Sequence, residues 1–226
     1  MKDLPKTCTM KALLQTAALS SCILVLSACA EEDESRYPSV VTDYACLATN
    51  TSGKPELLYL DNGCSYPITF TDEYREAHAP LPTYKADTLY RVISTYELGA
   101  DSTAQIYSMT QVLSPIPTPL RKGETLYQDP VYLQSCWLSG GYLNMVVEMK
   151  ALNGKHQVGF VDTTPDTMQG KEFTFYHKVV DDVESYRQEL YASIPLTPFR
   201  DELQQGDTLR LVINTYEGKQ EVSFAL

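Results

Sequence analysis

Short runs of alternating apolar and polar residues, separated by turn-forming residues, fill most of the chain beyond residue 39. The clearest run lies near residue 226, where Val222, Phe224 and Leu226 share one face and Glu221 and Ser223 share the other. Alternation with a period of two is typical of half-buried β-strands, and clusters of Gly, Asn and Asp mark the turns between them. The pattern therefore predicts an all-β protein.

The first half of this region predicts a small barrel. Its strand candidates are residues 40–49, 57–60, 64–70, 89–98 and 105–113. Asp61-Asn62-Gly63 is a hairpin signal because Asn and Gly tolerate positive φ. Residues 72–78 predict one helical turn, which the following prolines end. Five strands with a helical turn after the third are the arrangement of an OB-fold, so residues 39–114 predict an OB-like five-stranded barrel.

The second half predicts a seven-stranded β-sandwich over residues 130–226. Pro115, Pro117 and Pro119 cannot occupy a central strand, so residues 115–129 predict an extended Pro-rich connector. A short stretch at 199–205 has helical character. The strand candidates are 131–138, 142–150, 156–161, 172–180, 186–195, 208–216 and 220–226. Seven strands at this spacing are typical of a sandwich.

The segment before these domains predicts export and lipidation. Three lysines precede a largely apolar stretch at 12–28, and this order is typical of a secretory signal. The stretch is too short and too polar to span a bilayer comfortably. Cys29 follows Leu26-Ser27-Ala28, which resembles a bacterial lipobox. We therefore expect residues 1–28 to be a signal peptide and Cys29 to be acylated, with the lipid membrane as its partner. A soluble exported protein and an uncleaved anchor are the alternatives.

An acidic run follows the predicted lipidation site within residues 29–38, which we expect to form a tether. It consists of Glu31, Glu32, Asp33 and Glu34. The run is similar to the surface-export tag of Bacteroidota lipoproteins, while its simpler interpretation is a solvated chain extended by like-charge repulsion. We expect an outer-membrane lipoprotein exposed at the cell surface, with a periplasm-facing protein as the alternative.

Charge and composition narrow the class of partner. The formal net charge is −11, and loss of three lysines and one aspartate with the signal takes it to −13. Such a balance argues against nucleic acid, because phosphate backbones are bound by clustered Lys and Arg. A hydrophobic content of 43% is that of a globular protein. The sequence predicts folded domains with a protein or glycan ligand.

Three cysteines remain after the signal and Cys29 are set aside, namely Cys46, Cys64 and Cys136. A disulfide between Cys46 and Cys64 is possible in an oxidising compartment, and buried free thiols are the equal alternative. No closely spaced Cys or His pairs predict a zinc site. We expect no metal and no cofactor.

The search for catalytic motifs finds no nucleophile elbow, phosphate loop, dinucleotide fingerprint or EF-hand. His156 and His177 are candidates for a site, and with Asp181 or Asp182 they could approach a metal. The favoured interpretation is that each imidazole satisfies a backbone carbonyl or a turn, since two His without a third ligand specify little. We predict no catalytic residue.

Other side chains offer weaker hypotheses for sugar chemistry. Asp181 and Asp182 are a possible carboxylate pair for glycoside cleavage, although a solvated acidic loop is favoured. Trp137 and Tyr142 are candidates for stacking on a sugar ring, with core packing favoured for Trp137. Four tyrosines could form an aromatic face on the barrel: Tyr74, Tyr84, Tyr90 and Tyr96.

Two stretches resemble the NigD-like lipoproteins of Bacteroidota. The segment Tyr44-Ala45-Cys46-Leu47-Ala48-Thr49, with Leu58-Tyr59-Leu60-Asp61-Asn62-Gly63, resembles their N-terminal domain, and Ser135-Cys136-Trp137-Leu138-Ser139-Gly140-Gly141-Tyr142-Leu143-Asn144 resembles the hairpin that opens their C-terminal domain. The resemblance implies an OB-like barrel, a β-sandwich and a role in bacteriocin immunity. It carries over no catalytic residue. Cys136 departs from the bulky apolar residue expected before the tryptophan.

These observations together favour a non-catalytic, membrane-anchored envelope lipoprotein that acts as a binding or protective module. A glycan-binding accessory lipoprotein of a surface polysaccharide uptake system is the alternative, and an envelope glycoside hydrolase is a remote one.

Overall fold

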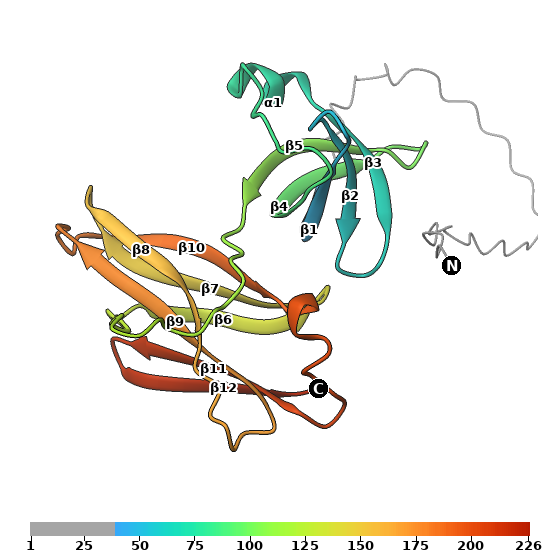
Figure 1. The fold of residues 1–226 in the computed structure, drawn as a ribbon. Helices are drawn as coiled ribbons and strands as arrows, with labels where there is room; N and C mark the ends of the chain where they lie inside the picture. The colour runs from blue at the N-terminus through green and yellow to red at the C-terminus, as the bar shows by residue number, and fades with distance from the viewer. Residues whose placement is uncertain (1–38) are drawn as a thin grey trace, which may run out of the picture.

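The computed structural model describes residues 39–226, which form a β-barrel followed by a β-sandwich (Figure 1). The predicted signal peptide, Cys29 and the acidic run Glu31–Glu34 lie outside the described residues. Within residues 39–226, no helix is long and apolar enough to cross a membrane.

The barrel closes in the strand order β1-β2-β3-β5-β4, with β3 and β5 parallel. Its elements are β1 (Val41–Thr49), β2 (Pro55–Leu60), β3 (Ser65–Phe70), α1 (Asp72–Ala77), β4 (Leu89–Leu98) and β5 (Ala104–Gln111). The short helix stands between β3 and β4, where Thr71 caps it by accepting a hydrogen bond from the Tyr74 backbone N–H. The predicted OB-like barrel is confirmed.

The alternating pattern decides which side chains fill the barrel. On β1, Ala45 and Leu47 are fully buried in the barrel core, while Tyr44 and Cys46 point outward. Tyr74 and Tyr96 also belong to this core. The possible aromatic face is therefore wrong for Tyr74 and Tyr96, whose rings fill the barrel core, whereas Tyr84 and Tyr90 are partly buried against it.

The sandwich pairs a three-stranded sheet, ordered β10-β7-β6, with a four-stranded sheet, ordered β12-β11-β9-β8. Its strands are β6 (Tyr132–Ser139), β7 (Tyr142–Ala151), β8 (Lys155–Asp162), β9 (Gly170–Val180), β10 (Tyr186–Pro195), β11 (Thr208–Thr215) and β12 (Gly218–Ala225). The predicted seven-stranded sandwich is confirmed. Helical structure within the sandwich is limited to η1 (Thr197–Phe199), so the helical character predicted at 199–205 is wrong. Turns replace it, one of them closed by Asp207, whose carboxylate accepts the Gln204 N–H.

The Pro-rich segment after the barrel runs along the sandwich, as Figure 1 shows. It contains no named strand, but isolated bridges attach it to four strands of the sandwich, β10, β8, β9 and β11: Leu113 to Ala192, Thr118 to Val161, Gln128 to His177 and Val131 to Thr215. Backbone groups near both of its ends, among them those of Leu113, Thr118, Tyr127 and Asp129, are thereby paired with the sandwich. This segment is consequently packed as part of the sandwich surface.

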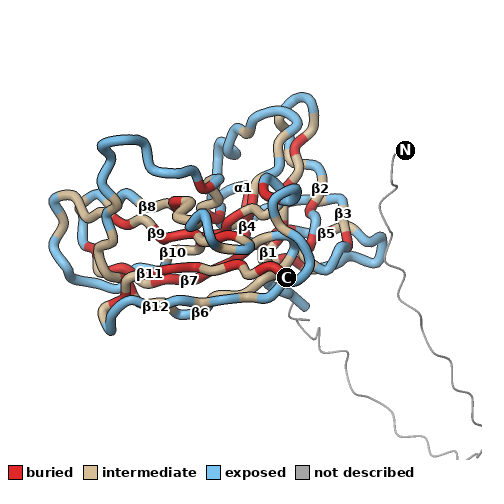
Figure 2. Tube along the Cα trace, turned by 60° about the horizontal axis from the view of Figure 1, so that its bottom comes forward, coloured by how far each residue is buried: buried red, intermediate tan, exposed pale blue. Residues whose placement is uncertain are grey.

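The sandwich core lies between the two sheets, where buried backbone runs along the strands (Figure 2). It includes Leu143, Val147, Phe173, Phe175, Ile194, Leu209, Leu211 and Ile213. On β12, Val222 and Phe224 are partly buried and alternate with exposed neighbours, as the pattern predicted. Burial of apolar area at about 25 cal/mol per Å² is the main stabilising contribution to such a core.

We predict that Phe173→Ala lowers the free energy of unfolding by about 3–5 kcal/mol, because it opens a cavity in a packed interior. Tyr186→Ala, at an exposed position, is the control and should change it by less than about 0.5 kcal/mol. Urea unfolding measures both values. Equal effects of the two substitutions would contradict the placement of the core.

Candidate functional site

The barrel and the sandwich meet along the outward face of β1 and β4, which packs on the β6–β7 hairpin. In register, Cys46 of β1 lies between Tyr59 of β2 and Arg91 of β4, so these three side chains share the outer barrel surface. We call the contact region centred on Arg91 the joint. Both stretches that carry the family resemblance converge on it.

Arg91 is the centre of the joint, with its side chain only 1% exposed. Its Nη1 donates to Asp61 Oδ1 at 2.5 Å and its Nη2 donates to Asp61 Oδ2 at 2.7 Å. Nη2 also donates to Asn144 Oδ1 across the joint at 2.9 Å. The bidentate pair with Asp61 lies within the barrel and fixes the direction of the guanidinium, and the bond to Asn144 then joins it to the sandwich.

On the sandwich side of the joint, hydrogen-bonded polar side chains form a network that starts from two buried residues. Asn144 and Ser193 are adjacent on β7 and β10 and fully buried, and Ser193 Oγ donates to Asn144 Oδ1 at 2.7 Å. Ser139 Oγ donates to Asp61 Oδ2 at 2.5 Å and accepts from Trp137 Nε1 at 3.2 Å. Asp61 is thus held by both domains at once.

Aromatic rings surround the guanidinium. The Arg91 Cζ lies 4.2 Å from the centre of the Tyr142 ring and 5.3 Å from that of Tyr44. Burial by itself would lower the pKa of Arg91, but hydrogen bonds and the charge of Asp61 raise it above its usual value. Burial raises the pKa of Tyr44 to about 12. Arg91 therefore carries a permanent buried charge.

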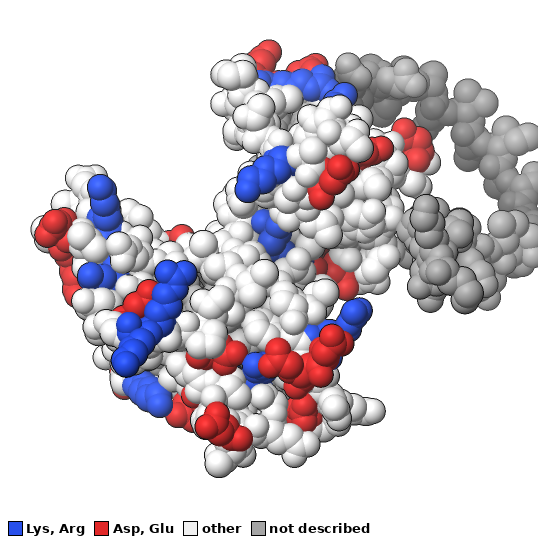
Figure 3. All heavy atoms as spheres, viewed as in Figure 1, with Lys and Arg blue, Asp and Glu red and all other residues white. Residues whose placement is uncertain are grey.

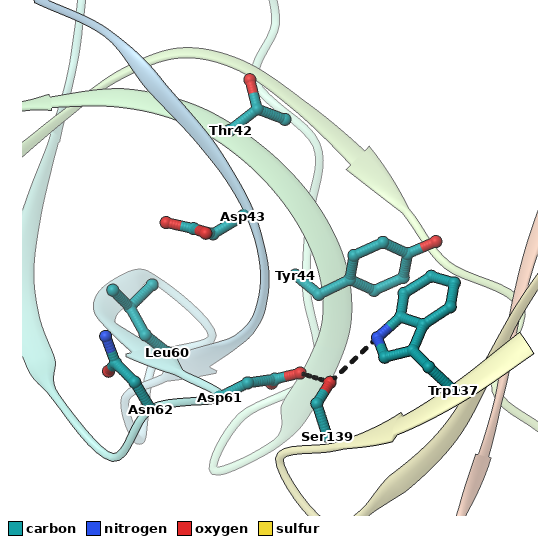
Figure 4. Close-up of a pocket in the computed structure, with 8 residues that line it drawn as sticks. All are labelled: Thr42, Asp43, Tyr44, Leu60, Asp61, Asn62, Trp137 and Ser139. Atoms are coloured by element: carbon teal, nitrogen blue, oxygen red, sulfur yellow. Dashed lines mark hydrogen bonds between the residues drawn. The ribbon is translucent and has the colours of Figure 1, made fainter. Parts of the chain in front are cut away.

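A cleft of about 310 Å³ opens beside the joint, between β1, the β2–β3 turn and β6 (Figure 4). Its lining combines carboxylates, an amide, hydroxyls and aromatic rings: Thr42, Asp43, Tyr44, Leu60, Asp61, Asn62, Trp137 and Ser139. Tyr44 and Trp137 meet edge to face, with ring centres 5.1 Å apart. We call this space the cleft; its chemistry suits a small polar ligand.

A wider groove of about 490 Å³ lies further along β1, on the Tyr142 side of the joint. Cys46, Tyr59 and Leu89 contribute to its lining. Tyr142 Oη lies 3.4 Å from Cys46 Sγ. The two binding candidates of the hairpin, Trp137 and Tyr142, therefore face different hollows on either side of one buried charge.

The structure places Trp137 and the three cysteines differently from several sequence hypotheses. Trp137 lies at the joint and lines the cleft, so the favoured packing of this ring in the sandwich core is wrong. Cys46 and Cys64 are free thiols. They do not form the possible disulfide because Cys46 faces the joint, whereas Cys64 belongs to the barrel core. Cys136 is also free, and burial raises its pKa to about 12.

His156 and His177 come together, as their spacing suggested, but they bond to each other. His156 Nδ1 lies 2.8 Å from His177 Nε2, and His156 Nε2 lies 2.8 Å from Asp182 Oδ2. No group of three or more His, Cys, Asp or Glu in residues 39–226 is arranged to hold a metal. Asp181 is exposed, whereas Asp182 is 3% exposed at its side chain and engaged with backbone N–H groups.

Sequence reasoning did not find Arg91, Asp61 and Asn144 as partners. Arg91 interrupts the apolar pattern of a strand. Burying a charge at such a position costs several kcal/mol of folding free energy unless the charge has a partner. That interruption was the signal available. Asp61 belongs to the hairpin turn Asp61-Asn62-Gly63, and turn formation alone already explained an aspartate at this position.

Comparison with known proteins finds one match to the C-terminal part of the chain and several solved structures that match both domains. The sequence profile of the NigD-like C-terminal beta sandwich domain matches residues 115–226. A NigD-like immunity protein from Bacteroides caccae ATCC 43185 is 26% identical with a TM-score of 0.63, over 83% of this chain and 93% of that chain. A Parabacteroides distasonis ATCC 8503 protein described as toxin-related is 21% identical with a TM-score of 0.60, over the same shares. No curated protein matches the chain.

An OB-like barrel joined to a β-sandwich by hydrogen bonds from a buried ion pair defines the class of this protein: a two-domain, all-β protein with hollows at the domain joint. Within it, residues 115–226 match the NigD-like C-terminal beta sandwich domain.

The hairpin glycines provide a test of the joint. Gly140 and Gly141 both have positive φ, but only at Gly140 would a Cβ collide with Asp61. We predict that Gly141→Ala costs about 1 kcal/mol through backbone strain. Gly140→Ala should cost about 3 kcal/mol or more, because it also disturbs the buried pair. Urea unfolding of the matched variants measures the difference, and equal losses would refute a tight joint.

Proposed function

We propose that this protein is a membrane-anchored envelope lipoprotein that protects the cell by binding a toxin-like protein, without catalysing a reaction. The observation that carries this proposal is the likeness to a NigD-like immunity protein, which extends over both the barrel and the sandwich. The lipobox-like residues before Cys29 support the membrane anchor, and the acidic run after it supports display at the cell surface.

The geometry supports binding by the assembled pair of domains. The bonds from Arg91 to Asn144 and from Ser139 to Asp61 join the barrel to the sandwich, so a partner meets a surface that is already formed. Preorganisation of this kind lowers the entropy cost of association. On the face in Figure 3, acidic and basic side chains are intermixed and wide areas carry neither. Such a surface favours a protein partner over a nucleic acid.

Expression in a bacteriocin-sensitive strain tests the protective role. We predict that the full chain increases survival under at least one bacteriocin of a panel. Cys29→Ala should lose that protection while the protein still accumulates, because it can no longer be acylated. Asp181→Asn, an exposed change, is the control. Unchanged sensitivity to the whole panel with full-length protein present would contradict the proposal.

A glycan-binding function is the second candidate, and the lining of the cleft is the observation that favours it. An indole, a carboxylate and an amide from Trp137, Asp43 and Asn62 surround one space. Aromatic faces and polar groups of this kind match the apolar and hydroxyl surfaces of a sugar.

Trp137 is the only tryptophan of the chain, so its fluorescence reports on the cleft directly. If the cleft binds glycans, a polysaccharide series should change this fluorescence in a saturable manner, and Asn62→Ala should weaken the effect. Tyr186→Ala, exposed and absent from the cleft lining, should not. A flat response to every glycan would exclude this second function.

A further inference from the structure

A second buried polar cluster lies in the sandwich, where the β7–β8 and β9–β10 turns meet. Asp182, between β9 and β10, has a side chain only 3% exposed. Its carboxylate accepts the backbone N–H groups of Leu152 at 3.1 Å, Asn153 at 3.1 Å and Val183 at 2.8 Å. One carboxylate thereby fastens the two turns to each other.

The cluster continues inward through two imidazoles. His156 Nε2 lies 2.8 Å from Asp182 Oδ2, and His156 Nδ1 lies 2.8 Å from His177 Nε2. His177 is 1% exposed, and its Nδ1 lies 2.9 Å from the backbone carbonyl oxygen of Asp129. The row therefore joins the two turns to the segment that runs from the barrel.

Counting protons along this row gives its charge. The Asp129 carbonyl can only accept, so His177 Nδ1 must carry a hydrogen. An ionised Asp182 also only accepts, so His156 Nε2 must carry one. The contact between His156 Nδ1 and His177 Nε2 needs one hydrogen more. Three protons on four ring nitrogens make one imidazolium.

The other protonation states do not fit these contacts. Two neutral rings that satisfy Asp129 and Asp182 would oppose two lone pairs at the contact between His156 and His177. Two imidazolium rings would oppose two N–H groups there. With Asp182 ionised, the observed distances suit the singly charged pair alone.

We infer that His156 and His177 hold a single shared proton against Asp182, and that this proton latches the two turns and the Asp129 segment together. We call this arrangement the latch. Loss of the proton breaks either the contact between the imidazoles or the one between His156 and Asp182, and gain of a second proton breaks the contact between the imidazoles. The latch makes this end of the sandwich sensitive to pH in both directions.

The charged groups near the two imidazoles are engaged with other partners or exposed, so Asp182 is the one that contacts the imidazoles. Asp129 Oδ2 accepts the Val179 N–H at 2.7 Å. From β9, the Lys178 ammonium lies over the Tyr127 ring. The other charged groups on these elements are exposed or paired outside the row: Asp181 and Lys155 are exposed, and Lys150 pairs with Glu184. Asp182 is consequently the counter-ion of the pair.

The directions in which the pKa values of His177 and Asp182 shift agree with an ionised Asp182 beside a singly protonated imidazole pair. Burial lowers the pKa of His177, opposed by the Asp129 carbonyl and assisted by the charge of His156. Burial alone would raise the pKa of Asp182, but hydrogen bonds from His156 and the turn backbone hold it well below its usual range. Both depressed values mean that folding loses stability as pH falls, first below about 6.5 for the histidine and then below about 4 for the carboxylate.

Nitrogen-15 NMR of the imidazoles in the intact protein measures the latch directly. The chain has three histidines, and the exposed His78 serves as internal reference. At neutral pH we expect three protonated nitrogens in the His156–His177 pair. Two protonated nitrogens would overturn the inference, and so would four.

Asp182→Asn provides the sharpest variant. The introduced amide can keep its oxygen on the backbone N–H groups and donate its N–H to His156 Nε2, which then needs no proton. Every contact of the row survives with two protons on the pair, so its NMR count should fall from three to two. Unfolding stability should also become less dependent on pH above neutrality than that of the wild type.

Asp181→Asn is the matched control, because it removes the same charge from the adjacent, exposed residue. Its proton count should remain three. A count unchanged by Asp182→Asn, or changed equally by Asp181→Asn, would show that Asp182 does not fix the proton. If Asp182→Asn fails to fold, the count in the wild type decides the question alone.

Discussion

The buried charge of Arg91 is the constraint on which the architecture depends. A guanidinium shut away from water is costly unless a carboxylate and further hydrogen-bond acceptors meet it. Here Asp61 and Asn144 meet it, one from the barrel and one from the sandwich. Replacing the ion pair with apolar residues would remove this directional requirement, whereas breaking it would leave a charge stranded between two domains.

Other features of the joint follow from that requirement. Ser193 keeps Asn144 in place, and Ser139 shares the Asp61 carboxylate. Gly140 allows the hairpin to approach Asp61 without a side chain in between. The residues that resemble the NigD-like motifs are thus explained largely by the contact between domains.

Strand positions were predictable from the sequence, because alternation and turn residues are local signals. The run at 186–195 and that at 89–98 match β10 and β4. The joint was not predictable in the same way. Arg91 and Asn144 are far apart in the chain, and only the paired geometry of two domains makes them partners. Asp61 had a sufficient local explanation in its turn, which hid its long-range role.

The two histidines illustrate an intermediate case. Their spacing indicated that His156 and His177 would meet on neighbouring strands, and they do so on β8 and β9. Their chemistry depends on hydrogen-bond direction, which sequence patterns do not encode. The carbonyl of Asp129 and the carboxylate of Asp182 supply that direction, in line with the favoured interpretation of imidazoles that satisfy a carbonyl and a turn, and the residues form a proton-holding latch.

Hydrogen exchange across a urea series, followed by mass spectrometry, tests most directly whether the joint unites the two domains. The account predicts that amides of β1 and β4 in the barrel lose protection at the same free energy as those of β7 and β11 in the sandwich. After Asp61→Ala, the two groups should separate. Separate opening of barrel and sandwich in the wild type would contradict the account, because the buried charge would then not be holding them as one unit.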